Sequence, residues 1–279
     1  MSEVLTIRVG VILLQTEKWP VDRERWMRAE ALGFHTAWTY DHLSWRDLKD
    51  GPWYAMVPLL AAVAQVTSTI RIGPLVASPN YRHPVPFAKE IMTLDELSGG
   101  RLTLGFGSGG TGWDATVLGH EPWPLSERTG RFLEFTDEMD RLLREPDVSF
   151  DGTYYAARNA MGHPGCVQSP RVPFALAGNG PRSIAKVVQH ADTWVTNVSL
   201  DDLPQRIETL EAAGGAHLNR LLSTTDDLPW VASPDAFDEL AGRAQELGMT
   251  DLAIHWPRSG SPYKGPDSIL DHIANRMHA

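Results

Sequence analysis

Short apolar segments alternate with longer amphipathic segments along most of the chain. A run of about four to eight apolar residues is typical of a buried strand, whereas apolar positions that recur every three or four residues indicate a helix. Strands are predicted at residues 7–14, 36–40, 71–77, 102–106, 173–177, 193–195 and 251–255. Helices are predicted at residues 20–32, 53–66, 84–97, 126–143, 181–190, 203–212, 234–247 and from 267 onward.

The repetition of a strand followed by a helix, about eight times, predicts an α/β protein with a parallel sheet. Such a sheet either closes into a (β/α)8 TIM barrel or stays open with helices on both faces. The 279 residues favour the barrel, which needs about 250 residues plus insertions. We therefore expect one barrel domain over residues 1–279.

Three segments interrupt the alternation, and the seventh strand is weak. Residues 43–55, 108–125 and 145–172 show no helical period and are interpreted as insertions or lids. The last of them is rich in Gly, Pro and Tyr and is also compatible with a small hairpin. Between 214 and 232 only residues 221–223 have strand character, so the seventh strand region is predicted to be reduced.

Composition narrows the range of functions. Hydrophobic residues make up 42% of the chain and charged residues 22%, which is typical of a globular protein. The net charge of −10 disfavours binding to nucleic acid or to anionic membranes. A single cysteine, Cys166, excludes an internal disulfide framework. With no secretory pattern and no apolar run of about 18 residues, we expect a cytoplasmic protein.

Two glycine turns follow predicted strands. Residues 105–110 formally fit G-x-G-x-x-G, but no helix start follows them, which disfavours a dinucleotide fingerprint. They form either a flexible turn or a backbone surface that a large planar or phosphorylated ligand approaches closely. Residues 177–182 run from a strand into a helix that starts at Pro181, so they form either a plain turn and cap or a phosphate site that includes Arg182.

The pair Asp41–His42 falls where the second strand ends, which is where catalytic residues of barrels gather. Histidine can exchange a proton near neutral pH, although a single histidine can equally be structural. Trp38, Tyr40 and Trp45 surround the pair and belong either to a ring-binding pocket or to the core. The sequence contains no zinc-ligand spacing, no G-x-S-x-G and no P-loop, so we expect neither a metal site nor a hydrolase.

Four segments, taken together, resemble the luciferase-like monooxygenase superfamily of flavin- and deazaflavin-dependent oxidoreductases. They are Ala-Leu-Gly-Phe at 31–34 leading to Asp41–His42, Tyr-Arg-His-Pro at 81–84, Thr-Leu-Asp-Glu-Leu-Ser-Gly-Gly-Arg-Leu at 93–102 with the following glycines, and Gly-Asn-Gly-Pro at 178–181 leading to His-Ala-Asp-Thr-Trp at 190–194. The match covers about residues 7–197 well and 233–256 more loosely.

The resemblance implies a barrel whose mouth holds FMN or coenzyme F420. In members of this family the ring rests on a bulge after strand three, often with a non-prolyl cis peptide, and the phosphate lies at a later glycine turn. His42 and Asp41 would be catalytic, and Trp45 and Trp113 would line the substrate pocket. The residues that would hold the cofactor are Val76, Ala77, Ser78, Gly105, Gly107, Ser108, Gly178, Asn179, Gly180 and Arg182.

The two cofactors imply different reactions. Asp41–His42 with Trp45, and the run at 81–84, look like the deazaflavin-using members, so we favour hydride transfer between F420 and a small organic substrate. Sugar-phosphate dehydrogenases of the family carry a Glu where this chain has Gly109 and Gly110, which argues against that substrate class. The alternatives are an FMN-dependent monooxygenase served by a separate flavin reductase, and a flavin-binding protein without turnover. The family also implies a homodimer.

Overall fold

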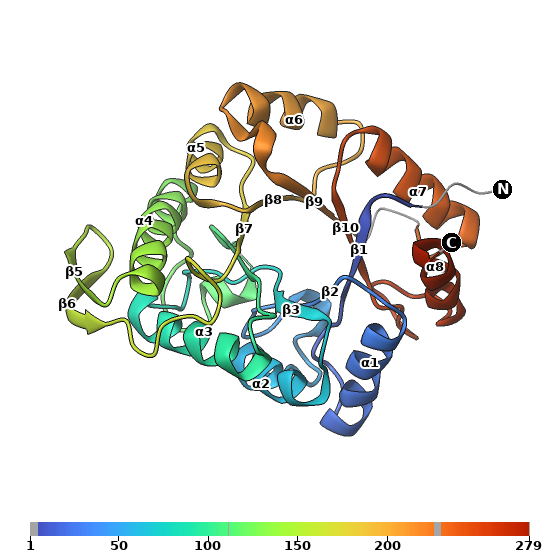
Figure 1. Cartoon of the computed structure of the whole chain (residues 1–279), viewed down its shortest axis with the longest axis horizontal. Helices are drawn as coiled ribbons and strands as arrows, with labels where there is room; N and C mark the ends of the chain where they lie inside the picture. Colours follow the sequence, from blue (N-terminus) through green and yellow to red (C-terminus); the bar gives the residue numbers. More distant parts are fainter. Residues whose placement is uncertain (1–4, 111, 226–229, 279) are drawn as a thin grey trace.

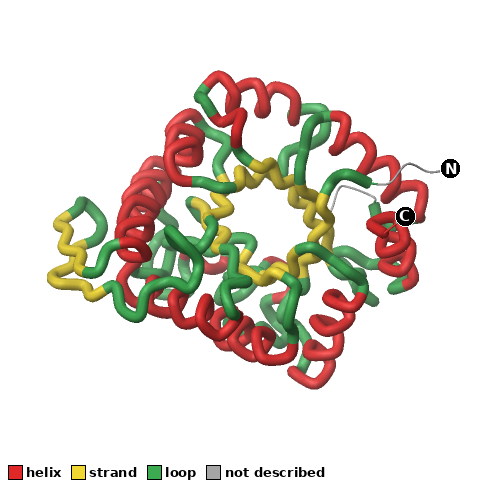
Figure 2. Tube along the Cα trace, viewed as in Figure 1, coloured by secondary structure: helices red, strands yellow, loops and turns green. Residues whose placement is uncertain are grey.

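The computed structural model describes residues 5–110, 112–225 and 230–278, apart from the side chains of Asp47 and Trp113. Within these residues eight parallel strands surround a central axis, and eight helices form a ring outside them (Figure 1, Figure 2). The barrel strands are β1 (Arg8–Ile12), β2 (Thr36–Thr39), β3 (Arg71–Pro74), β4 (Leu104–Gly107), β7 (Phe174–Ala177), β8 (Thr193–Thr196), β9 (Asn219–Ser223) and β10 (Asp251–His255). The predicted TIM barrel is confirmed.

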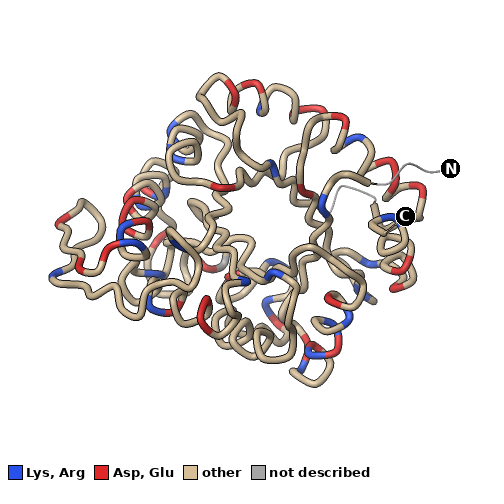
Figure 3. The backbone as a smooth tube through the Cα atoms, viewed as in Figure 1, with Lys and Arg blue, Asp and Glu red and all other residues tan. Residues whose placement is uncertain are grey.

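The outer helices follow the strands in the predicted alternation. They are α1 (Trp19–Ala31), α2 (Met56–Val66), α3 (Pro84–Ser98), α4 (Leu125–Arg144), α5 (Pro181–His190), α6 (Leu203–Ala212), α7 (Pro234–Glu246) and α8 (Ser268–His278). Lys, Arg, Asp and Glu lie mostly on this ring and its loops, whereas the barrel strands are mostly uncharged (Figure 3). None of these helices has both the length and the apolar character that a membrane crossing requires, among the residues described.

The strands run in the order β3–β2–β1–β10–β9–β8–β7–β4, and the barrel closes between β3 and β4. That closure uses two isolated bridges, Ile72 with Leu102 and Ala77 with Phe106, instead of a continuous ladder. Two glycines allow the close approach. A Cβ atom on Gly73 would lie 1.9 Å from the carbonyl oxygen of Thr103, and one on Gly105 would lie 2.2 Å from that of Pro74.

The strand predicted at 71–77 ends as β3 at Pro74, because the backbone leaves the ladder there. The Leu75–Val76 peptide is cis and non-prolyl, in the segment where the family resemblance implies one. The Leu75 N–H donates to Thr39 O at 2.8 Å, and the Ala77 N–H donates to Gly105 O at 2.8 Å. The segment therefore stays attached to both neighbouring strands and bulges toward the barrel mouth.

Two sequence expectations need correction. The seventh barrel strand is β9, which is five residues long and pairs with both β8 and β10, so the strand itself is not shortened. Residues 226–229, in the segment after it, lie outside the described residues. The small hairpin that the sequence allowed at 145–172 is confirmed as β5 (Asp147–Asp151) with β6 (Ala156–Met161). It projects beside α4 at the periphery and does not cover the mouth, so the interpretation as a lid is wrong (Figure 1).

Candidate active site

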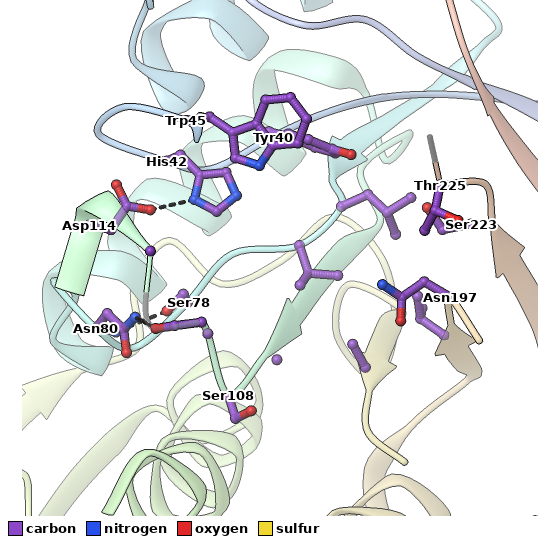
Figure 4. Close-up of a pocket in the computed structure, with 18 of the residues that line it drawn as sticks. Tyr40, His42, Trp45, Ser78, Asn80, Ser108, Asp114, Asn197, Ser223 and Thr225 are labelled. Carbon is purple, nitrogen blue, oxygen red and sulfur yellow. Dashed lines mark hydrogen bonds and ion pairs between the residues drawn. The ribbon is translucent and has the colours of Figure 1, made fainter. Parts of the chain in front are cut away.

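A cavity of about 530 Å³ opens at the carboxyl ends of the strands. Its wall takes residues from the ends of β2, β3, β4, β7, β8 and β9 and from the segment after β10. In barrel enzymes this face carries the active site, and the volume lies within the usual range for small-molecule pockets, about 300–1,000 Å³. Figure 4 shows His42 and Asp114 at one side of the cavity, with Asn197, Ser223 and Thr225 at the other. The cavity is the candidate active site.

His42 is held by a carboxylate that the sequence analysis did not identify. Its Nδ1 is hydrogen-bonded to Asp114 Oδ2, and Asp114 Oδ1 accepts the N–H groups of Leu43 at 2.6 Å and Ser44 at 3.3 Å. Asp114 is buried, whereas the His42 side chain is 30% exposed and lines the cavity. A carboxylate at Nδ1 fixes the ring orientation and makes Nε2 the nitrogen that can exchange a proton with a ligand.

Asp41 does not line the cavity, so its predicted catalytic role becomes one of positioning. Its two carboxylate oxygens accept Arg82 Nε–H at 2.7 Å and Nη2–H at 2.8 Å, and its backbone oxygen accepts the Tyr81 hydroxyl at 2.6 Å. Burial alone would lower the pKa of Arg82, but the hydrogen bonds and charge of Asp41 raise it above its usual value. This buried pair anchors the backbone that carries His42.

The predicted cofactor residues fall into two groups. Those that line the cavity are Val76, Ser78, Gly107, Ser108, Gly178 and Asn179. Ala77 and Gly105 do not, because they belong to the seam between β3 and β4. Gly180 and Arg182 are exposed at the start of α5, outside the cavity wall. A phosphate at Arg182 therefore stays a prediction that the geometry of the cavity does not support.

Aromatic rings form one wall of the cavity. Tyr40 meets His42 edge to face at 5.7 Å between ring centroids and meets Trp45 at 5.2 Å. Trp45 stacks on Trp53, whose indole N–H donates to the backbone oxygen of His42 at 2.8 Å. Trp45 thus lines the cavity, whereas the side chain of Trp113, in a turn after β4, is outside the described part of the chain.

Two side chains that line the cavity carry buried polar atoms with unused hydrogen-bonding capacity. Asn80 Oδ1 and Ser44 Oγ have no hydrogen-bond partner among the described residues, although Asn80 Nδ2 donates to Gly110 O at 3.2 Å. Buried polar atoms of this kind are rarely left unsatisfied. Nothing in the sequence marked either residue, because both positions depend on how separate loops converge.

The rest of the lining suits a flat heteroaromatic ring. Leu75, Val76, Ala177 and Val195 supply apolar surface, and a Cβ atom on Gly107 would come within 3.1 Å of Ala177 Cβ and within 3.3 Å of Val76 Cγ2. Hydroxyl and amide groups line two sides of the cavity (Figure 4). The residues present therefore fit a flavin or deazaflavin, and in the described part of the chain no cluster of His, Cys, Asp or Glu could hold a metal ion.

Comparisons with known proteins identify the family of the chain. A family model described as luciferase-like monooxygenase matches residues 4–224. An uncharacterized protein of Mycobacterium tuberculosis is 30% identical over 213 residues, which cover 74% of this chain and 69% of that protein. An F420-dependent glucose-6-phosphate dehydrogenase of Beutenbergia cavernae is 39% identical over 158 residues, which cover 55% of this chain and 45% of that protein.

Two solved structures share the fold over nearly their whole length. A coenzyme F420-dependent tetrahydromethanopterin reductase from Methanopyrus kandleri superposes with a TM-score of 0.80 at 18% identity, covering 98% of both chains. An F420-dependent secondary alcohol dehydrogenase in complex with an F420–acetone adduct gives 0.82 at 16% identity, covering 97% of this chain and 98% of that one. At these identities the likeness concerns the fold alone.

Proposed function

The chain belongs to the luciferase-like monooxygenase family, and from that premise we propose that it is an F420-dependent oxidoreductase. It moves a hydride between the deazaflavin and a small organic substrate. The observation that carries this proposal is one cavity at the barrel mouth that joins the β3 bulge, the β4 and β7 glycine turns and the His42–Asp114 pair. The family premise supports F420 or FMN, and the F420-dependent names among the sequence relatives favour F420.

Residues of this chain would bind and orient the cofactor. Val76 and Ala177 offer apolar surface to the ring, and Asn80 Oδ1 and Ser44 Oγ offer buried acceptors to its polar edge. The cofactor supplies the hydride chemistry when it is bound, and the protein supplies orientation and electrostatics. Because Gly107 has no side chain, the ring can approach the backbone at the end of β4. A Cβ atom there would crowd Ala177 and Val76.

His42 would exchange the substrate proton. When Asp114 accepts a hydrogen bond from Nδ1–H, the His42 Nε2 atom carries a lone pair that faces the cavity and can take the proton of a substrate hydroxyl. Asp114 then stabilises the imidazolium that forms. In the reverse direction the same nitrogen returns the proton. General acid–base assistance of this kind contributes about 10²–10⁴-fold to a rate.

The test replaces His42 by Gln in the full chain. We expect unchanged binding of F420 and a turnover about 10²–10⁴-fold lower, because only the proton exchange is lost. F420 reduction is followed with a panel of alcohols, aldoses and sugar phosphates. The matched control is His217→Gln, an exposed histidine in the turn Gly215–His217 that precedes β9. A His42→Gln protein at the full rate would refute this role.

Other outcomes of the same assay point to other functions. Binding of FMN with oxygen uptake in the presence of a flavin reductase would indicate the monooxygenase alternative. Tight binding of F420 without turnover of any substrate would indicate a carrier. We also propose that the chain forms a homodimer, which light scattering of the purified protein tests directly.

A further inference from the structure

A buried histidine stands directly behind the aromatic wall of the cavity. His255 is the last residue of β10 and is fully buried. Its Nε2 lies 2.7 Å from the Tyr40 hydroxyl oxygen, and its Nδ1 lies 3.2 Å from Thr224 Oγ1. The ring of Tyr263 stacks on it with centroids 3.4 Å apart. Tyr40, Thr224 and Tyr263 all line the cavity, so His255 connects three wall residues from behind.

His255 is held in its neutral form. Burial lowers its pKa well below the usual value, and the positive charge of Arg46 lowers it further. A neutral imidazole has one N–H donor and one lone pair, so its two hydroxyl partners must bond it in opposite senses. If Thr224 donates to Nδ1, then Nε2–H donates to the Tyr40 oxygen. In that arrangement the Tyr40 proton is directed away from His255.

Tyr40 and His42 line the same wall of the cavity. They are separated by one residue after β2, their rings are 5.7 Å apart and nearly perpendicular, and both line the cavity beside Trp45. The proposed function gives His42 the substrate proton but leaves the substrate oxygen without a fixed hydrogen-bond donor. A positioned donor at an oxygen that gains negative charge in the transition state is a large contribution to catalysis.

We propose that Tyr40 is a second catalytic residue, which donates a hydrogen bond to the substrate oxygen, and that His255 and Thr224 are positioning residues that set the direction of its hydroxyl. In the oxidation of an alcohol, the substrate O–H bond breaks and its proton passes to His42 Nε2. The substrate C–H bond breaks with both electrons, and the hydride reduces F420. The C=O bond forms while its oxygen accepts the Tyr40 hydrogen bond, and Tyr40 keeps its proton throughout.

This inference rests on the proposed function, and its test uses the full chain with F420. The probes are propan-2-ol, cyclohexanol, 1-phenylethanol, glucose and glucose 6-phosphate. We expect Tyr40→Phe to lower turnover by about 10²-fold, the effect of removing one such donor, with F420 affinity unchanged. Tyr154→Phe is the matched control, because it removes a tyrosine hydroxyl beside the peripheral hairpin, where the Tyr154 ring packs against Arg131 of α4.

A second variant separates positioning from simple packing. His255→Phe keeps a stacked ring beside Tyr263 but removes both nitrogens. If His255 acts only through Tyr40, the double variant Tyr40→Phe/His255→Phe is no slower than Tyr40→Phe alone. Losses that multiply would instead show a separate role for His255 and would contradict its assignment.

The outcomes distinguish the two proposals. A wild-type chain that fails to bind F420 overturns the proposed function, and this inference falls with it. If the wild-type chain binds F420 and turns over a probe, a Tyr40→Phe variant with the full wild-type rate overturns the inference alone. A chain that binds F420 but turns over none of these oxygen-bearing probes indicates a carrier, which overturns the proposed function and this inference together.

Discussion

At the scale of single residues, the neighbours Asp41 and His42 have different tasks. His42 faces the cavity, whereas Asp41 is buried in an ion pair with Arg82. The pair could be located from sequence because it follows a strand, where barrel active sites lie. The different roles of the two residues could not be predicted from sequence, because the partner of His42, Asp114, is 72 residues away on another loop. A carboxylate that reaches a histidine across two loops leaves no local pattern.

The role of Asp114 can be tested by an almost isosteric change. In Asp114→Asn the amide can present its N–H to His42 Nδ1, which favours the other tautomer and puts a proton on Nε2. We expect a loss of alcohol oxidation of about 10²-fold or more, within the range for general-base catalysis, with F420 affinity retained. Steady-state kinetics and a fluorescence titration measure the two effects. Equal rates for variant and wild type would show that Asp114 only anchors its loop.

Asp22, in the first turn of α1, predicts a pH dependence of stability. Burial raises its pKa from 3.8 to about 7, against the opposing charge of Arg25, and its Oδ1 has no hydrogen-bond partner in the described structure. The unfolded chain therefore releases this proton at lower pH than the folded chain. The free energy of unfolding falls as pH rises from about 4 to about 7, and the loss is complete above that.

Asp22→Asn removes this ionisation. We expect the variant to gain stability over the wild type as pH rises from 4 to 8, as measured by urea unfolding at each pH. Asp201→Asn, at an exposed aspartate before α6, is the control and should show no such trend. A difference that stays constant between pH 4 and pH 8 would mean that Asp22 is ionised normally in the folded chain.

At the scale of elements, local sequence signals predict most helix ends. They do not predict where two backbone segments approach each other closely. Ser233 caps α7 by accepting the Ala236 N–H at 3.1 Å, as its place before Pro234 predicts, and α3 ends at Gly99 in the left-handed region. Gly105 is the opposite case. Its place in a glycine-rich turn suggested a cofactor, whereas the structure shows it where β4 approaches Pro74. Such contacts are long-range and have no local signature.

Gly105→Ala separates the two interpretations of that glycine. A methyl group 2.2 Å from the Pro74 oxygen forces the seam apart, so we expect a loss of stability of about 1–3 kcal/mol. Gly242→Ala, inside α7 with no atom within 4 Å of the added methyl, should instead gain about 0.5–1 kcal/mol. Thermal and urea unfolding measure both. A stable Gly105→Ala protein that has lost only cofactor affinity would restore the cofactor interpretation.

At the scale of the whole molecule, barrel closure gathers loops from seven strands around one cavity. The repeated strand and helix units predicted this architecture, and the amino ends of β1 and β10 are tied by exposed Arg8 and buried Asp251 at 2.7 Å. Because successive parallel strands end at the same face, residues from 40 to 263 meet at one mouth. The sequence could indicate that face, but it could not indicate that Tyr40 and His255 meet there, 215 residues apart.

The proposed function requires that the barrel mouth binds a deazaflavin. The most direct measurement is an equilibrium titration of the wild-type chain with F420, followed by the cofactor's own fluorescence, with FMN titrated in parallel. We expect saturable quenching of F420 fluorescence in the micromolar range and weaker binding of FMN. Binding of FMN alone would contradict the deazaflavin assignment, and binding of neither would contradict the cofactor site itself.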